Sequence, residues 1–148
     1  MRTFVVALLV GGIIHQSACS DEPTDLEKLQ GEWLITRIEA KGKQIFPAPQ
    51  TKLAKEAPSV MTIKKDQASL QGENWGTLVL QSTTPKKLDL IYGDGTVTRG
   101  IFRFDSDNRI TLTWGGTTDE ESARPKVFQT DNTSIGIRTL TLERRKTN

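Results

Sequence analysis

Two side chains in this 148-residue chain could act as nucleophile, imidazole base or soft metal ligand, and both lie near its start. His15 is the only histidine and Cys19 the only cysteine. Catalytic pairs of the Ser–His or Cys–His type need one of these residue types, and so do zinc sites built from imidazole and thiolate. The sequence also has no glycine-rich phosphate-binding loop. Both residues lie in a segment that, as described next, we predict to be removed or lipid-modified. We therefore expect a mature protein that is not an enzyme and that holds no metal or other cofactor.

The segment that contains these two residues has the pattern of an export signal. Arg2 supplies a positive charge, and the apolar run from Phe4 to Ile14 is shorter than the about 20 residues that a membrane-spanning helix needs. We predict that residues 1–18 are a signal peptide and that residues 19–24 form a polar tether. Removal of this leader also removes His15 from the mature protein.

Cys19 has the setting of a lipid-attachment site. The residues Gln16-Ser17-Ala18-Cys19 resemble a bacterial lipobox, in which small residues precede a cysteine that receives diacylglycerol and becomes the mature N-terminus. With no second cysteine, Cys19 cannot form an internal disulfide in an oxidising compartment. Two acyl chains give firm membrane anchoring. We predict an exported lipoprotein on the periplasmic or cell-surface side of a membrane; the alternative is a secreted protein that is cleaved nearby.

Composition places the mature chain among small soluble domains. Apolar residues make up 35% and charged residues 26% of the sequence, and the length suits one core without disulfide or metal support. The net charge of +2 is too small to indicate nucleic-acid binding, and the basic run at residues 144–146 is typical of a solvated tail. We expect a monomer that does not bind nucleic acid.

The remaining sequence alternates β-rich runs with turn residues. Thr24 and Glu27 fit a capping box, so a short helix is expected over residues 25–30 before Gly31. A segment with three prolines at 41–59 is interpreted as a lid loop. Eight strands are predicted, at 32–40, 60–65, 75–81, 87–92, 97–105, 109–115, 126–130 and 138–144. Short links between consecutive strands predict an all-β fold: an eight-stranded antiparallel up-and-down barrel over residues 25–145.

Alternation within these strands predicts which side chains face the core. The threonines at 111, 113, 139 and 141 are expected to face water. In the first strand the alternation changes phase near Thr36, so a β-bulge there would turn Arg37 outward; without a bulge Arg37 would lie inside the barrel. The predicted core residues are Met61, Ile63, Leu78, Leu80, Leu88, Leu90, Tyr92, Phe102, Phe104, Ile110, Leu112, Trp114, Leu140 and Leu142.

Strand parity predicts which loops share an end of the barrel. The eighth strand should finish beside the first, which brings Arg144 or Arg145 onto the indole of Trp33, where a cation–π contact can form. The lid, residues 83–85, residues 106–108 and residues 131–136 should then lie at the opposite end. That opposite end is the expected mouth of the barrel.

Several short motifs support this architecture. They are Gly31-x-Trp33 with a closing Arg144, the longer opening Asp25-Leu26-x-Lys28-Leu29-Gln30-Gly31-x-Trp33, Gly42-Lys43, Gly100-Ile101-Phe102-x-Phe104, Arg124-Pro125 followed by Phe128, and Leu140-x-Leu142-x-Arg144. On these motifs the chain resembles the lipocalin and calycin group, and over residues 25–145 a lipocalin-like domain family of unknown function that occurs as paralogues in planctomycetes. The resemblance implies an exported lipocalin-like barrel of unassigned activity and brings no catalytic residues with it.

Two functions remain open at this point. The first is a binding module for a small apolar or amphipathic ligand, with Phe46 on the lid and Tyr92, Phe102, Phe104 and Trp114 lining the inside. The second is a barrel filled by its own side chains, which would act as a structural or protein-interaction module of the cell envelope. The carboxylates, such as Asp105 and Asp107, lie mostly in turns, where forming the turn is their ordinary role.

Overall fold

A computed structural model describes residues 22–46, 58–117, 120–131 and 136–146. The predicted signal peptide, Cys19 and residues 47–57 of the lid lie outside the described residues. The elements are α1 (Asp25–Leu29), β1 (Gly31–Ala40), β2 (Lys43–Phe46), β3 (Val60–Lys64), β4 (Gln67–Leu70), β5 (Glu73–Gln81), β6 (Lys86–Ile91), β7 (Val97–Ser106), β8 (Arg109–Thr117), the 3-10 helix η1 (Glu121–Ala123) and β9 (Arg138–Arg144).

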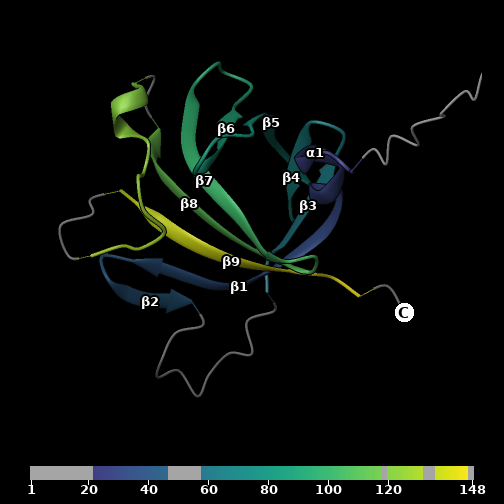
Figure 1. Ribbon diagram of the computed structural model, residues 1–148, viewed down its shortest axis with the longest axis horizontal. Coiled ribbons are helices and arrows are strands. Elements are labelled where there is room, and N and C mark those ends of the chain that lie inside the picture. The colour runs from purple at the N-terminus through teal and green to yellow at the C-terminus, as the bar shows by residue number, and fades with distance from the viewer. Residues whose placement is uncertain (1–21, 47–57, 118–119, 132–135, 147–148) are drawn as a thin grey trace, which may run out of the picture.

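The strands form a closed antiparallel barrel (Figure 1). From β3 to β9 each strand pairs with the next along the chain, and β1 closes the ring by pairing with both β3 and β9. The short strand β2 is additional and pairs only with the last residues of β1. The prediction of an all-β, eight-stranded, lipocalin-like barrel is therefore confirmed.

One end of the barrel, here called the helix end, is closed by α1. The predicted capping box is present: the Thr24 hydroxyl accepts from the backbone N–H of Glu27, and the Glu27 carboxylate accepts from that of Thr24. Asp25 then binds the ammonium of Lys86 at 2.7 Å and the hydroxyl of Ser82 at 3.0 Å, which holds α1 against the β5–β6 link. This places Leu29, 2% exposed, as a plug in the barrel.

The first and last strands meet at the same end. Trp33 pairs directly with Arg144, and the Arg144 guanidinium carbon lies 4.2 Å from the centroid of the indole. The same guanidinium donates to the carbonyls of Gln30 and Lys28. Gly31 has a φ of +112°, and a Cβ there would lie 3.1 Å from Arg144 Nη1. The three residues singled out as a signature in the sequence are thus in contact with one another.

The predicted bulge in β1 is also confirmed. The pairing of β1 with β9 shifts register between Ile35 and Arg37, so that Ile35 is buried and Arg37 is exposed on the outside. Arg37 forms an ion pair with Glu39. The bulge therefore removes a guanidinium from the core.

The barrel has eight strands, but they are not the eight that the sequence predicts. Strand β4 was not expected, because the turn at Lys65–Asp66 contains no glycine or proline; Lys65 itself adopts a φ of +56°. Conversely, residues 126–130 form no strand, and the prediction there is wrong. Within the ring of eight, one missed and one false strand cancel in the count. The additional strand β2 was also missed, because its residues fall in the segment 41–59 that was predicted to be a lid loop.

The strand that was missed shifts the direction of the strands that follow, so two loops were placed at the wrong end. The link at residues 83–85 lies at the helix end, since Ser82 and Lys86 bind Asp25 of α1. The turn at 106–108 is also there, because the Asn108 carbonyl accepts from the backbone N–H of Arg144. The Lys41–Gly42 turn and the first residues of β9 do lie at the opposite end, here called the far end.

Residues 120–131 form a strap across the outside of the barrel. It begins on β6 and β7, where Arg124 donates to the Gly100 carbonyl, and it reaches the β1–β2 turn, where the Thr130 hydroxyl accepts from Gly42. Between these points the sheet order places β8 and β9. Figure 1 shows η1 and β2 on the same side of the molecule, away from α1. The strap explains why residues 126–130 pair with no strand: they pack on the outer wall instead.

The four threonines predicted to face water are buried, which corrects that prediction. Thr111, Thr113, Thr139 and Thr141 are 8%, 0%, 5% and 9% exposed. The strap crosses their face of the sheet, and the hydroxyls of Thr113 and Thr139 satisfy each other at 2.9 Å. The Thr111 hydroxyl donates to Asp105 at 2.6 Å. The central residues of β8 and β9 are therefore buried on both faces of the sheet.

Candidate functional site

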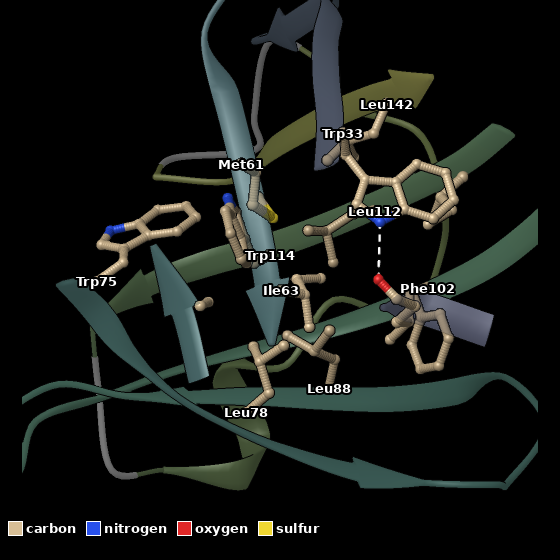
Figure 2. Close-up of a pocket in the computed structure, with 13 residues that line it drawn as sticks. Trp33, Met61, Ile63, Trp75, Leu78, Leu88, Phe102, Leu112, Trp114 and Leu142 are labelled. Atoms are coloured by element: carbon tan, nitrogen blue, oxygen red, sulfur yellow. Dashed lines mark hydrogen bonds between the residues drawn. The ribbon is translucent and has the colours of Figure 1, made fainter. Parts of the chain in front are cut away.

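The interior of the barrel is lined only by apolar and aromatic side chains (Figure 2). Its free space measures about 20 Å³, room for roughly one water molecule. In this closed form the interior is filled by the protein's own side chains. The lining residues are Leu29, Trp33, Met61, Ile63, Ala68, Trp75, Leu78, Leu88, Phe102, Ile110, Leu112, Trp114 and Leu142.

The helix end of this interior is fixed by a hydrogen bond. The Trp33 indole nitrogen donates to the Leu29 carbonyl at 2.8 Å, the dashed line in Figure 2, and the Trp33 side chain is fully buried. The Arg144 guanidinium covers the outer face of the same indole. Moving Trp33 would break all of these contacts, so opening this end would cost more than opening an end without such contacts.

The far end is closed by two tryptophans that meet edge to face. The rings of Trp75 and Trp114 have centroids 5.0 Å apart and an interplanar angle of 82°. Figure 2 shows this pair on the side of the interior away from Trp33 and Phe102. Trp75 is half-buried, whereas Trp114 is 8% exposed. Trp75 is therefore the solvent-facing member of the closure.

A β-bulge aims Trp75 inward. Ala68 pairs with Gly76 and Ser69 pairs with Asn74, which leaves Trp75 as the extra residue between them. Simple alternation would put Trp75 on the opposite face from Leu78, yet both line the interior. At Gly76 a Cβ would collide with the Ile91 carbonyl of the neighbouring strand, so only glycine allows this close approach.

The structure gathers only part of the ligand site predicted from the sequence. Phe102 and Trp114 line the interior. Tyr92 is half-buried and its hydroxyl lies 3.2 Å from that of Thr98, while Phe104 stacks edge-on against Phe102 towards the helix end. Phe46 pairs with Ile38 on the additional strand β2. The sequence analysis did not include Trp75 among the lining residues. The one sequence signal for its inward position is Gly76, which follows it.

A second cluster, of charges, lies on the outer wall beneath the strap. Arg124 is 7% exposed, and its guanidinium lies 2.7 Å from Asp89 Oδ1 and donates to Glu121 at 2.7 and 2.8 Å. Arg99 pairs with the other Asp89 oxygen at 2.9 Å, and Lys87 with Glu121 at 2.9 Å. Hydrogen bonds from Arg124 and Lys87 lower the pKa of Glu121 to about 2. These ion pairs link Glu121 and Arg124 of the strap to Lys87 and Asp89 of β6, so the cluster attaches the strap to the outer wall of the barrel.

Two kinds of feature are absent from the described residues. No group of three or more His, Cys, Asp or Glu side chains is arranged there to hold a metal ion. In the same residues, no helix has the length and apolar character that crossing a membrane requires.

No family model, curated protein or solved structure matches the chain. The function must therefore be argued from the site alone.

Proposed function

We propose that this chain is an exported, lipid-anchored binding module of the lipocalin type, which takes a small apolar or amphipathic ligand into its barrel and catalyses no reaction. One observation carries the proposal: in the described part of the chain, a wholly apolar interior is fixed at the helix end by the Trp33 hydrogen bond, whereas at the far end it is covered by the edge-to-face contact of Trp75 with Trp114. An interior of this composition suits the apolar part of a ligand.

The ligand enters by displacing Trp75. Ligand pockets usually measure about 300–1,000 Å³, far more than the 20 Å³ of the closed form. An edge-to-face ring contact adds about 0.5–1.5 kcal/mol beyond the burial of the two rings, and Trp75 is only half-buried, so rotating Trp75 outward costs less than moving the fully buried Trp33. Rotation leaves an indole-sized space that opens directly onto Ala68 and Leu78.

The position of Pro23 indicates how a barrel anchored through Cys19 would be oriented, with its mouth turned away from the bilayer. Pro23 contacts the helix end, where it lines a surface hollow with Lys28 and Arg144. Cys19 precedes Pro23 by four positions, which an extended chain spans in at most about 14 Å. A lipid on Cys19 would therefore hold the helix end close to the membrane and leave the far end facing solvent.

The direct test is a binding measurement on the intact chain. Decanol, titrated by calorimetry, should bind the wild type, and Trp75→Ala should bind it more tightly because the mouth no longer has to open. Val79→Ala is the matched control, because Val79 lies on the same strand but is 42% exposed outside. Native mass spectrometry of protein from its own host should show an added small-molecule mass.

The competing function is a filled barrel that serves as a structural or interaction module of the envelope. The small interior volume favours it. It predicts a clean ligand-free mass from several preparations and no decanol binding by either the wild type or Trp75→Ala. That combined result would overturn the binding proposal and leave the filled barrel as the function.

A further inference from the structure

A second hollow lies at the rim of the far end, between β2 and the start of β9. Its volume is about 300 Å³, within the range of small-molecule sites and far larger than the free space inside the barrel. It is lined by Ala40, Lys41, Lys43, Ile45, Gly136, Ile137 and Arg138. We call it the rim pocket.

The rim pocket is cationic and its cations are unpaired. Three of its lining side chains, those of Lys41, Lys43 and Arg138, carry positive charge, and no lining residue is acidic. Within the described part of the chain, none of the three makes an ion pair. Elsewhere on the barrel, Lys86, Lys87, Arg99, Arg103, Arg124 and Arg145 have carboxylate partners, whereas Lys64, Lys65 and Arg109 make no ion pair among the described residues. The rim pocket therefore differs in gathering three unpaired cations around one hollow. The acidic residue Asp131 lies against Gly42, between Lys41 and Lys43, but it does not line the hollow. Like charges gathered around a hollow repel one another, and an anion placed among them relieves that repulsion.

The pocket is also partly apolar. Ile45 is 47% exposed, and Ile137, which lines the same hollow, is half-buried. Ile45 is the extra residue of a bulge, because Phe46 pairs with Ile38 while Gln44 pairs with Glu39. A ligand that satisfied both the cations and the isoleucines would have to be amphipathic.

Strand register connects the rim pocket with the mouth of the barrel. Trp114 pairs with Arg138, Arg138 pairs with Ala40, and Ala40 pairs with Lys43. Directly opposite residues in antiparallel strands share a face and have Cβ atoms about 4.5–5.5 Å apart. The row therefore runs from Trp114, one of the two tryptophans that cover the far end, to the two cations Arg138 and Lys43 on the same side of the sheet, and the small Ala40 between these cations leaves space.

We propose that the rim pocket binds the anionic head group of an amphipathic ligand whose apolar tail passes Trp114 into the barrel. The guanidinium of Arg138 donates hydrogen bonds to the head group, and Lys43 and Lys41 neutralise its charge. The part of this inference that concerns the tail rests on the proposed function; the head-group site does not. The ligand class is a small amphiphile with a carboxylate or phosphate head.

Decanoate and decanol, which share a tail and differ in head-group charge, test the proposal. In calorimetric titrations at pH 7 and low salt, decanoate should bind the wild type about tenfold more tightly than decanol, as one charge-assisted contact provides. Arg138→Gln should weaken decanoate binding about tenfold and leave decanol unchanged. Lys43→Gln is a second variant with the same expectation. Arg145→Gln, at the helix end, is the control and should change neither.

The outcomes separate the head-group site from the tail site. Equal affinities of the wild type for decanoate and decanol, or an equal loss of both in Arg138→Gln and Lys43→Gln, would overturn the rim pocket. If decanoate binds no more tightly than hexanoate while Arg138→Gln still weakens both acids, the head-group site stands and the interior does not take the tail. Absence of any binding would overturn both proposals.

Discussion

Removal of the Arg124 guanidinium should destabilise the barrel more than any exposed charge can. Arg124→Met keeps much of the side chain's apolar volume but takes one partner from Asp89, whose side chain is 12% exposed, and a donor from the Gly100 carbonyl. It also frees the strap at its most buried point. The substitution thus leaves a buried carboxylate with half of its ion-pair contacts.

The magnitude follows from what remains after the substitution. Breaking a buried ion pair by removing one partner costs about 3–5 kcal/mol. Arg99 still lies 2.9 Å from Asp89, and the other partner, Glu121, is 54% exposed, so water compensates part of the loss. We therefore expect the lower value, about 3 kcal/mol. For a domain of this size that corresponds to a fall in Tm of roughly 10 °C.

Thermal unfolding followed by circular dichroism measures this loss. Arg145→Met is the matched control, because Arg145 and its partner Glu32 are 52% and 44% exposed, and it should cost less than about 1 kcal/mol. Adding Asp89→Asn to Arg124→Met should recover part of the stability, since the buried charge is then gone. Equal Tm values for the two arginine variants, or purely additive losses in the double variant, would refute the idea of a buried, coupled clasp.

Three further substitutions probe the wall of the barrel. Gly76→Ala should cost about 2–3 kcal/mol in urea unfolding, because its Cβ collides with the Ile91 carbonyl, whereas Gly116→Ala, with nothing within 4 Å, should cost under 1 kcal/mol; similar costs would contradict the close approach. Thr113→Val should cost about 1–2 kcal/mol by leaving the buried Thr139 hydroxyl without its partner, and Thr113→Val with Thr139→Val should recover most of this. Glu121→Gln should flatten the acid dependence of stability. The pKa of Glu121 is lowered from 4.5 to about 2 in the fold, so its contribution is complete above pH 4.5 and is lost as the pH falls towards 2. Identical acid profiles of the variant and the wild type, measured by urea unfolding from pH 5 to 2, would contradict this reading.

Most of the fold could be predicted because local signals and the global pattern agree. The capping box at Thr24, the phase change near Thr36 and the alternation that turns Phe102, Leu112 and Leu142 inward each depend on neighbouring residues only, and each is present. The contact of Trp33 with Arg144 needed one additional assumption, that the last strand returns beside the first.

Each wrong prediction has a physical reason that cannot be read from neighbouring residues in the sequence. The turn at Lys65–Asp66 uses a lysine in the left-handed region, a conformation that sequence rules assign to glycine or asparagine. Residues 126–130 alternate like a strand, but the buried Arg124 just before them fixes the chain on the outer wall. The side chains of Thr113 and Thr139 are dry only because the strap crosses them.

The apolar and aromatic character of the candidate site could be predicted from the sequence, but not all of the residues that form it. Phe102 and Trp114 follow the alternation of their strands and reach the interior. Trp75 reaches it through a bulge, which depends on the pairing of β4 with β5, and β4 was not foreseen. The rim pocket combines residues about a hundred positions apart, Lys43 and Arg138, and only the closed ring brings them together.

The double pairing of β1 also sets the order in which this protein can be made. One edge of β1 is occupied by β9 along nearly its whole length, so the first and the last strand must both be present before the ring exists. Contacts between residues more than a hundred positions apart form slowly, because the intervening chain must first be brought to closure. A nascent chain that lacks residues 138–144 would carry an open sheet edge and a bare indole, and would depend on protection from aggregation until its final residues arrive.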